Sequence, residues 1–415
     1  MMSNLYLEGV AFHKIGELFN SFSGMSKVSR KWADEGNCKF IDYLNVYNNT
    51  NVDISKLQNA TVESFKQNTL QKGDILLTSA SETPRECAIS AVIRENIADD
   101  TFLDDHLFGI RIKEEHKSVV NPAFVNYYFY TPRFRIEICK IVRGVTRFYI
   151  VNKNFLNIEI PLPPIEVQNE IVRILDKFTQ LEAELEAELD CRKRQYEFYR
   201  DQLLSFGKIT PPERNNVVWK KLNEVGTLVR GNGLQKKDFT PNGVGCIHYG
   251  QIYTHYRTFA TETITCCSEE LAKKLRTAEY GDVVIATTSE NVEDVCKAVA
   301  WLGKESIAIS GDAYIYKHNQ NPKYIAYIFQ TGNFFDYKKR KANGTKVIRL
   351  SGDAIGKYEV PLPPIEEQNR IVAILDRFES LTTSLQHGLP AEIAARRQQY
   401  EYYRDKLLDF KRKTA

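Results

Sequence analysis

The sequence lacks the features that a secreted or membrane-embedded chain needs. Its 415 residues include eight cysteines, but none forms a C-x-x-C pair. We therefore expect reduced thiols rather than a zinc site or a disulfide framework. No run approaches the roughly 18 apolar residues of a membrane-spanning helix, and the first residues lack the basic start and apolar core of a signal peptide. We expect a cytoplasmic chain with no membrane partner.

Signatures of self-contained catalysis are also missing. No Pro-Asp dipeptide occurs, so the commonest nuclease metal signature lacks its first half, and no G-x-x-x-x-G-K-[ST] phosphate-binding loop is present. Asn121-Pro122-Ala123-Phe124 distantly resembles the Asn-Pro-Pro-aromatic motif of amino-methyltransferases, and the other half has Asn321-Pro322-Lys323-Tyr324 at the equivalent place. Because the residues that follow them differ, we interpret both as a turn that begins a helix. We predict no catalytic residue and no metal site.

Charge of one sign is scarce too. There are 56 Lys and Arg residues against 53 Asp and Glu residues, which gives a formal net charge of +3. This excess is too small to indicate a polyanionic partner, so any nucleic-acid surface must come from local clustering. A hydrophobic content of 43% and a charged content of 26% are ordinary for a folded globular protein.

What the sequence does contain is a strong internal repeat. PLPPIEVQNEIVRILDKFTQL begins at Pro161 and PLPPIEEQNRIVAILDRFESL begins at Pro361, and 15 of these 21 positions are identical. A second pair of blocks, at 194–206 and 398–410, matches at nine of 13 positions. The segments before each block match more faintly, with Gly144 and Gly344 at equal distances before the two PLPP motifs. We infer two similar units that act on different targets.

The repeated blocks read as long helices. Residues 165–206 carry apolar residues at steps of mostly three or four, which predicts one helix of roughly 60 Å with a narrow apolar seam. The second block has the same seam, with a break expected near 387–390 because Gly388 and Pro390 interrupt it. A narrow seam needs a partner helix. If the second helix leads the chain back along the first, the two are antiparallel.

The remaining segments mix short strand signals with helical runs. Stretches such as ILLTSA and VVIATT predict strands, and FVNYYFYTPRFRIEICKIV and YIAYIFQTGNFFDYKKRK predict helices. We therefore predict an α+β fold with a pseudo-twofold internal repeat and two long antiparallel helices. The predicted boundaries are a globular domain at 1–160, a central helical region at 161–208, a second globular domain at 209–360 and a C-terminal helical region at 361–412.

Basic residues cluster beside glycines at matching places in both halves, and this recurrence favours phosphate contact over ordinary surface charge. One matched pair of clusters lies near Gly144 and Gly344, and another lies upstream of it in each half. The predicted DNA-binding residues are Lys27, Arg30, Lys31, Arg143, Arg147, Lys153, Arg230, Lys236, Lys237, Lys338, Lys339, Arg340, Lys346 and Arg349.

The arrangement resembles the specificity subunit of a type I restriction–modification enzyme. PLPPIEVQNEIVRILDKF with RQYEFYRDQLL, and PLPPIEEQNRIVAILDRF with QQYEYYRDKLL, carry the resemblance, together with the LEAE-LEAE stretch of the central helix. The resemblance covers the whole chain in layout. It implies that the two globular domains are target-recognition domains, and that the chain is a non-catalytic subunit that binds an asymmetric two-part sequence in double-stranded DNA.

The resemblance also implies a bacterial or archaeal source, and it implies partners and cofactors. Two modification subunits would bring S-adenosylmethionine and adenine methylation, and restriction subunits would bring nuclease and ATP-driven activity with magnesium, so this chain would bind no cofactor itself. We expect partner contacts at the matched helix residues Tyr196, Tyr199, Arg200, Tyr400, Tyr403 and Arg404, although the tyrosines could instead only fill the helix seam. The alternative functions are a single-chain DNA-modifying enzyme with an unrecognised catalytic site, and a repeat scaffold that does not bind DNA.

Overall fold

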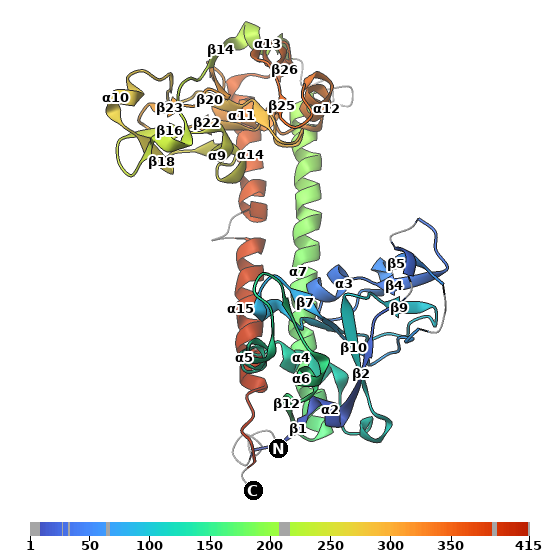
Figure 1. The fold of residues 1–415 in the computed structure, drawn as a ribbon. Helices are drawn as coiled ribbons and strands as arrows, with labels where there is room; N and C mark the ends of the chain where they lie inside the picture. Colours follow the sequence, from blue (N-terminus) through green and yellow to red (C-terminus); the bar gives the residue numbers. More distant parts are fainter. Residues whose placement is uncertain are drawn as a thin grey trace. The chain divides into compact units, whose positions relative to one another are not determined.

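The computed structural model describes residues 9–26, 28–31, 34–63, 67–206, 216–383 and 388–413. The chain divides into two compact units (Figure 1). Unit 1 comprises residues up to Leu185 together with Ile393–Ala415, and unit 2 comprises Glu186–Glu392. The helix α7 (Ile165–Ser205) is continuous across the boundary. Each unit therefore contains one half of α7 and one segment of the C-terminal helical region.

Unit 1 is built on two four-stranded sheets. The central sheet has the antiparallel order β2-β10-β6-β8, and the outer sheet has the order β3-β5-β4-β9, in which β4 and β9 are parallel. Two-stranded ribbons join β1 to β12 and β7 to β11. The strands are β1 (Ala11–Lys14), β2 (Phe19–Ser23), β3 (Val28–Lys31), β4 (Cys38–Ile41), β5 (Gln58–Val62), β6 (Ile75–Thr78), β7 (Ala80–Ser81), β8 (Ser90–Val92), β9 (Thr101–Leu103), β10 (Leu107–Ile112), β11 (Phe148–Tyr149) and β12 (Glu159–Leu162).

Short helices connect and cover these strands. The expected helical runs form α4 and α5, each of which starts with a proline at its first position and an N-cap side chain just before it, Asn121 for α4 and Thr131 for α5. The helices are α2 (Ile15–Leu18), α3 (Tyr43–Asn48), η1 (Ile54–Lys56), η2 (Pro84–Glu86), η3 (Glu114–His116), α4 (Pro122–Phe129), α5 (Pro132–Ile141) and α6 (Asn152–Leu156).

Unit 2 repeats this plan with one further strand in each sheet. Its sheets have the orders β14-β24-β20-β22-β17 and β15-β18-β16-β23-β19, and the parallel pair β16–β23 takes the place of β4–β9. The ribbons β13–β26 and β21–β25 repeat those of unit 1. The strands are β13 (Val218–Lys221), β14 (Gly226–Arg230), β15 (Phe239–Thr240), β16 (Val244–Ile247), β17 (Phe259–Ala260), β18 (Thr265–Cys267), β19 (Thr277–Ala278), β20 (Val283–Ala286), β21 (Thr288–Ser289), β22 (Ala298–Trp301), β23 (Ile307–Ile309), β24 (Ala313–His318), β25 (Ile348–Arg349) and β26 (Glu359–Leu362).

The helices of unit 2 repeat those of unit 1 as well. Asn321 and Thr331 cap α11 and α12 as Asn121 and Thr131 cap their counterparts. The helices are α8 (Leu222–Val225), η4 (Lys236–Asp238), α9 (Tyr249–Thr254), α10 (Glu269–Ala272), α11 (Pro322–Ile328), α12 (Gly332–Lys341) and α13 (Gly352–Gly356). The predicted α+β class and the internal repeat are confirmed.

The long helices pack antiparallel within each unit. In unit 1 Phe178 of α7 stacks on Tyr403 of α15 (Leu389–Leu407) with ring centroids 5.5 Å apart, and Glu182, further along α7, pairs with Arg397, which comes earlier in α15. In unit 2 Tyr199 stacks on Phe378 of α14 (Ile365–Thr383) at 5.8 Å.

The C-terminal helix is interrupted, as predicted. The helix α14 ends at Thr383 and α15 begins at Leu389, although part of the expected break lies outside the described residues. Predicted seam positions that depart from the prediction include the equivalent residues Leu181, which is 45% exposed, and Leu381, which is 55% exposed.

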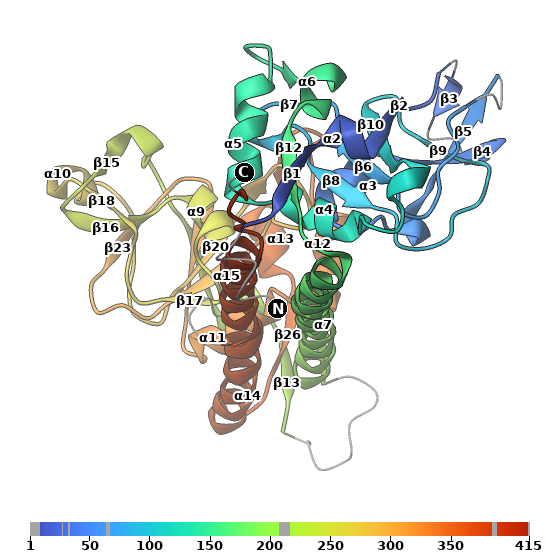
Figure 2. The ribbon, with the colours of Figure 1, turned by 90° about the horizontal axis from the view of Figure 1, so that it is seen from below.

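The end of the chain returns to its beginning within unit 1. The Val10 amide donates to the Lys411 carbonyl at 2.9 Å, and the Lys413 amide donates to the Val10 carbonyl at 3.0 Å. Figure 2 shows this C-terminal segment beside β1. Phe410 and Leu408 are buried in the core that also holds Ile171 and Leu175 of α7. Unit 1 thus depends on both ends of the sequence for its core.

Candidate nucleic-acid interface

A tight hairpin loop presents cations at the surface of unit 1. After α5 the chain reverses at Gly144 and returns as β11, and two hydrogen bonds of 3.0 and 2.9 Å join the backbones of Arg143 and Tyr149. Gly144 has a φ of +115°, and a Cβ there would lie 2.0 Å from the Arg147 carbonyl oxygen. Only glycine fits such a position. The loop exposes Arg143 and Arg147, with Val145 between them 91% exposed.

Unit 2 has the same hairpin with its cations at other positions. Gly344 has a φ of +113°, and Asn343 and Arg349 make the two backbone bonds at 2.9 and 2.8 Å. Lys346 and Arg349 are exposed. Asn343 and Val347 occupy the places of Arg143 and Arg147. The predicted match between basic clusters therefore holds for the loop as an element but not for its individual positions.

The prediction that Lys338 binds DNA is wrong. Its side chain is only 4% exposed, and its Nζ donates to the carbonyl oxygens of Glu293 and Val295 at 2.7 and 2.8 Å. Burial lowers the pKa of its ammonium group. The basic run on α12 suggested a surface cluster, but helical periodicity turns this one residue inward. Lys338 is part of the core of unit 2.

The other predicted cations differ in how available they are. Lys31 is held by Asp104 at 3.1 Å and by Asp105. Arg230 donates its Nε to the Gly311 carbonyl at 2.9 Å but remains exposed. Arg30 lies in β3, and Lys27 lies outside the described residues. Exposed cations that make no such bond to another described residue include Lys153 on α6, Lys236 and Lys237 on η4, and Lys339 and Arg340 on α12.

A cleft beside the hairpin of unit 1 contains residues that the sequence analysis missed. It has a volume of about 510 Å³, and its lining includes Tyr43, Tyr47, Glu86, His106 and Arg147. The rings of Tyr43 and Tyr47 stack with centroids 5.6 Å apart at an angle of 18°. The spacing Tyr-x-x-x-Tyr recurs in α9 as Tyr249 and Tyr253. That recurrence is the signal by which the sequence could have revealed the pair.

Hydroxyl groups hold the Glu86 carboxylate in this cleft. Thr83 Oγ1 and Ser81 Oγ donate to Glu86 Oε2 at 2.8 and 3.2 Å. Hydrogen bonds from Thr83, Tyr47 and Ser81, with that from Thr83 the strongest, lower the pKa of Glu86 below its usual value. The carboxylate is therefore ionised at neutral pH. An ionised acceptor thus lines the same cleft as Arg147.

The same place in unit 2 has different chemistry. Asp294 stands where unit 1 has Glu86, and Lys297 Nζ and Asn291 Nδ2 approach it to 2.6 and 2.9 Å. The Tyr253 hydroxyl donates to the Thr288 carbonyl of β21, much as the Tyr43 hydroxyl donates to the Ala80 carbonyl of β7 at 3.3 Å. The frameworks of the two units are alike here, and the side chains that face the surface are not.

One cluster has the composition of a metal site. Among the described residues, Asp104, Asp105 and His106 bring carboxylate and imidazole atoms within 4.8 Å of one another. The ammonium group of Lys31 already contacts both carboxylates. The position that a cation would take next to these two acids is thus shared with an ammonium group.

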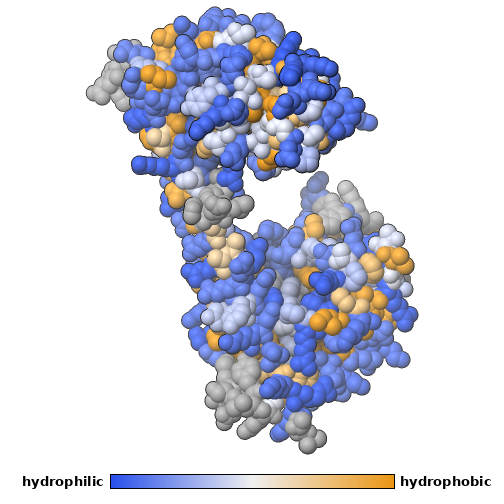
Figure 3. Space-filling view, turned by 90° about the vertical axis from the view of Figure 1, so that its left-hand side faces the viewer, coloured by the Kyte–Doolittle hydropathy of each residue, from blue (hydrophilic) through white to orange (hydrophobic). Residues whose placement is uncertain are grey.

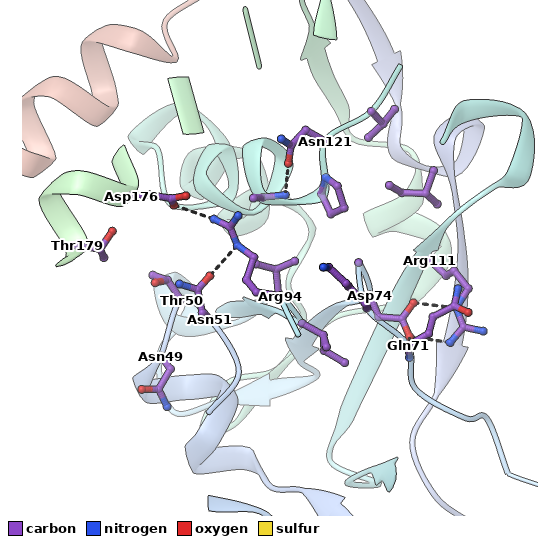
Figure 4. A pocket seen from close by; sticks show the side chains of 18 of the residues that line it. Asn49, Thr50, Asn51, Gln71, Asp74, Arg94, Arg111, Asn121, Asp176 and Thr179 are labelled. Carbon is purple, nitrogen blue, oxygen red and sulfur yellow. Dashed lines mark hydrogen bonds and ion pairs between the residues drawn. The ribbon is translucent and has the colours of Figure 1, made fainter. Parts of the chain in front are cut away.

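A larger cavity of about 970 Å³ lies between the globular part of unit 1 and α7 (Figure 4). Arg94 crosses it, and its guanidinium donates to Asn51 Oδ1 at 3.1 Å and to Asp176 Oδ1 at 2.8 Å. At the far side Arg111 makes a two-bond pair with Asp74 at 2.8 and 2.6 Å. The guanidinium groups in this cavity are paired. We therefore interpret the role of Arg94 as structural, because its two hydrogen bonds connect the globular part of unit 1 to α7.

The predicted partner-binding residues form equivalent arrangements in the two units. The arginines are largely buried, with 11% of the Arg200 side chain and 12% of the Arg404 side chain exposed. Each lies over the neighbouring tyrosine, Tyr196 or Tyr400, at 5.6 Å from the ring centroid. Tyr199 and Tyr403 stack on Phe378 and Phe178 of the opposing helix.

Two aromatic residues that the sequence analysis passed over are more exposed than these tyrosines. Phe198 is 58% exposed and Tyr402 is 60% exposed, and each packs edge-on against its neighbour in the chain, Tyr199 or Tyr403, at 5.5 and 5.3 Å. They occupy equivalent positions in the two copies of the repeated block. Each unit thus presents one exposed aromatic pair on its helical part.

The rest of the visible surface is mainly polar. Figure 3 shows a face on which hydrophobic residues are scattered in small groups among hydrophilic ones. Within the described part of the chain, no helix combines the length and the apolar character that crossing a membrane requires.

Two units of one plan, each with an exposed basic hairpin, attached to long antiparallel helices, define a repeated recognition protein rather than an enzyme with a single cleft. A family model described as the type I restriction modification DNA specificity domain matches the chain twice, over residues 8–190 and 215–395. The chain belongs to this family, whose members are DNA sequence-recognition components and not catalytic ones.

Individual relatives agree with this assignment. The chain is 35% identical to the EcoR124I/EcoR124II type I restriction enzyme specificity subunit of Escherichia coli, over 64% of this chain and 66% of that protein. It is 29% identical to a protein of Haemophilus influenzae that is named as a type I restriction enzyme specificity subunit, over 74% and 76% of the two chains. A solved structure from work on complex assembly of the type I R-M system shares the fold, with a TM-score of 0.65 at 14% identity, over 96% of this chain and 97% of that one.

Proposed function

We propose that this chain recognises an asymmetric sequence in double-stranded DNA as two separate parts, one for each unit. The observation that carries the proposal is the pair of hairpins at Gly144 and Gly344. Their backbones are alike, whereas the side chains that they expose differ. A shared framework with different surface chemistry is what two readers of different sequences require.

Affinity and specificity would then come from different residues. Exposed cations such as Arg143, Arg147, Lys346 and Arg349 contact phosphates, which supplies affinity that weakens as salt rises. The residues of the cleft beside the unit 1 hairpin, and those at the same place in unit 2, reach base edges, which supply sequence information. Lys153, Lys236, Lys237, Lys339 and Arg340 remain candidates for phosphate contact.

We also propose that two modification subunits dock on the matched helix surfaces. Equivalent surfaces can recruit identical partners twice, and the exposed pairs Phe198–Tyr199 and Tyr402–Tyr403 are aromatic, as the central residues of protein interfaces often are. Next to these pairs, Arg200 packs over Tyr196 and Arg404 packs over Tyr400. S-adenosylmethionine would bind to the modification subunits, and ATP and magnesium to restriction subunits that join the complex.

The test is to map modified adenines in DNA treated with the assembled complex. We expect one two-part sequence with a fixed unread spacer. Replacing Arg143 and Arg147 together with alanine should reduce the slope of log affinity against log salt by about 0.9 for each lost phosphate contact. The control is the replacement of Glu114 and Glu115, which are exposed on η3, with alanine. An unchanged slope would remove the hairpin from the DNA-binding surface.

The alternative of a single-chain modifying enzyme makes the opposite prediction. The purified chain, incubated alone with DNA and S-adenosylmethionine, should transfer no methyl group. Transfer by the chain alone would overturn the proposed division of labour.

A further inference from the structure

The Glu86 carboxylate faces a cleft whose position suits it to contact a base rather than a phosphate. The cleft lies between α3 and the hairpin that carries Arg147. Its acidic lining residues, Glu82 and Glu86, would repel a phosphate group. Hydroxyl donors fix Glu86, with Thr83 Oγ1 at 2.8 Å. A fixed acceptor at the edge of a basic surface can favour one kind of group on DNA, a hydrogen-bond donor on a base.

The four bases differ in how they would meet a carboxylate in the major groove. Cytosine presents the N4 amino donor with no acceptor of its own beside it. Adenine presents its N6 donor next to the N7 acceptor, which a carboxylate repels. Guanine and thymine present acceptors at the corresponding positions. A carboxylate therefore selects cytosine over the other three bases.

The comparison of the two units supports a role in specificity. The hairpin and the short aromatic helix are repeated in unit 2, but Asp294 takes the place of Glu86 and is engaged by Lys297 at 2.6 Å. Where two readers share a framework, the positions that choose the sequence are those that differ in chemistry. Glu86 is such a position, and within the described residues hydroxyl groups hold its carboxylate where a lysine engages Asp294.

We propose that Glu86 is a specificity-determining residue of unit 1 that accepts a hydrogen bond from the N4 amino group of a cytosine in the first part of the target. Arg147 holds the adjoining phosphate, and the stacked pair of Tyr43 and Tyr47 forms the wall of the cleft. This inference rests on the proposed function, because it assumes that unit 1 contacts DNA through this face.

The substitution Glu86→Gln tests the proposal in the complete complex with its modification subunits. Glutamine has nearly the same shape, but it pairs well with adenine through N6 and N7. We expect one base of the first half-site to change from cytosine to adenine, with discrimination altered on the order of tenfold. The second half-site and the spacer should stay the same. Sequencing the methylated sites gives the result directly.

Two further variants keep the test decisive. Glu115→Gln removes an exposed carboxylate elsewhere in unit 1 and should leave the recognised sequence unchanged. Tyr47→Phe removes one hydroxyl donor to Glu86 without changing its charge, and should weaken discrimination at the same base, so it serves if Glu86→Gln lowers the yield of folded protein. An unchanged half-site in Glu86→Gln and in Tyr47→Phe would overturn the role of Glu86 while leaving the proposed function intact. A wild-type complex that modifies no two-part sequence would instead overturn the proposed function itself.

Discussion

At the scale of single residues, the strongest repeated motif turns out to hold the structure together. Gln168 is fully buried, and its side chain accepts from the Asn121 amide at 2.8 Å and donates to the Val119 and Pro163 carbonyls at 2.9 and 2.7 Å. Gln368 accepts from the Asn321 amide at 3.1 Å in the same way. The side-chain amides of Asn121 and Asn169 bond each other at 2.8 Å. The Q-N of each motif thus fixes the start of a helix in the globular part, where its burial demands full hydrogen bonding.

In the two units, equivalent carbonyl groups accept hydrogen bonds from cations that stand at different positions of the helix. In unit 1 the Arg135 guanidinium donates to the carbonyl of Arg85 at 3.0 Å and also to that of Cys87. In unit 2 the equivalent carbonyls belong to Glu293 and Val295, and Lys338 serves them from one turn further along its helix. Positions at i and i+3 share a helix face, so either can reach the same turn.

Replacing Lys338 with alanine separates its structural role from DNA binding. Two carbonyls lose their donor, so we expect unit 2 to lose about 1–3 kcal/mol of stability. The salt dependence of DNA binding should not change. Lys339→Ala, at the exposed neighbouring position, should leave stability within about 0.5 kcal/mol of the wild type. Urea denaturation and salt titrations of DNA affinity measure both effects. A slope that falls by about 0.9 in Lys338→Ala would contradict the structural assignment.

His318 should make unit 2 sensitive to acid. Burial lowers the pKa of His318 to about 4, and its Nε2 is enclosed without a hydrogen-bond partner among the described residues. The unfolded chain takes up the proton near pH 6.5, whereas the folded unit does not until about pH 4. The folded state is therefore fully stable above pH 6.5 and loses roughly 2–3 kcal/mol as the pH falls toward 4.

Unit 1 suggests the substitution that tests this, because it has Ile112 at the end of β10, where unit 2 has His318 at the end of β24. His318→Ile should reduce the difference in thermal unfolding midpoint between pH 7.5 and pH 4.5. Equal acid sensitivity in the variant and the wild type would show that carboxylates, and not His318, govern this range.

At the scale of elements, the hairpins depend on a single backbone conformation. A residue with a side chain at Gly344 would adopt a left-handed φ of +113° and place its Cβ 2.0 Å from the Val347 carbonyl oxygen. The backbone must open to relieve this contact. The bonds between Asn343 and Arg349 would then lengthen, and Lys346 would move.

Gly344→Ala should therefore weaken binding to the complete target by on the order of tenfold while leaving the sequence of the first half-site unchanged. Gly281→Ala is a demanding control, because Gly281 also has a positive φ of +92° but no atom lies within 4 Å of the added Cβ. Affinity measured on targets with each half-site altered in turn checks this. A loss of affinity confined to the first half-site would contradict the proposal that unit 2 reads the second half-site.

At the scale of the whole molecule, unit 1 is built from two segments that lie at opposite ends of the sequence. The C-terminal segment completes the core of unit 1, where Phe410 and Leu408 are buried and the backbone of Lys411 bonds Val10. A short linker between the two ends of the sequence should therefore fit the fold, because Val10 and Lys413, described residues close to the two ends, already bond each other.

A circular permutant tests this. If a short linker joins the C-terminus to the N-terminus and the chain is opened near Gly207–Pro212, which lies outside the described residues, we expect a folded protein that recognises the same two half-sites with the same spacer. Methylation mapping of the permuted complex gives the answer, with the linear wild type as control. A permutant that fails to fold would show that the new chain ends disturb unit 2.

Much of this architecture could be read from the sequence, because the signals are local. Helical periodicity predicted α7 to within one residue, Asn-Pro predicted the capped starts of α4 and α11, and Gly-Pro spacing predicted the break between α14 and α15. The repeat predicted two equivalent units, and the family followed from the repeated motifs. Each of these depends on neighbours within a few turns of chain.

Tertiary structure alone decided which side chains face the solvent. Lys338 and Arg340 are two residues apart on one helix, and packing buries the first and exposes the second. The cleft around Glu86 joins α3, the β7–η2 turn and the hairpin, segments that are separated by tens of residues. The sequence by itself determined the elements and the repeat, since hydrogen bonding and apolar periodicity act locally. The availability of a charge and the lining of a cleft required the fold, because both depend on what packs against a residue from elsewhere in the chain.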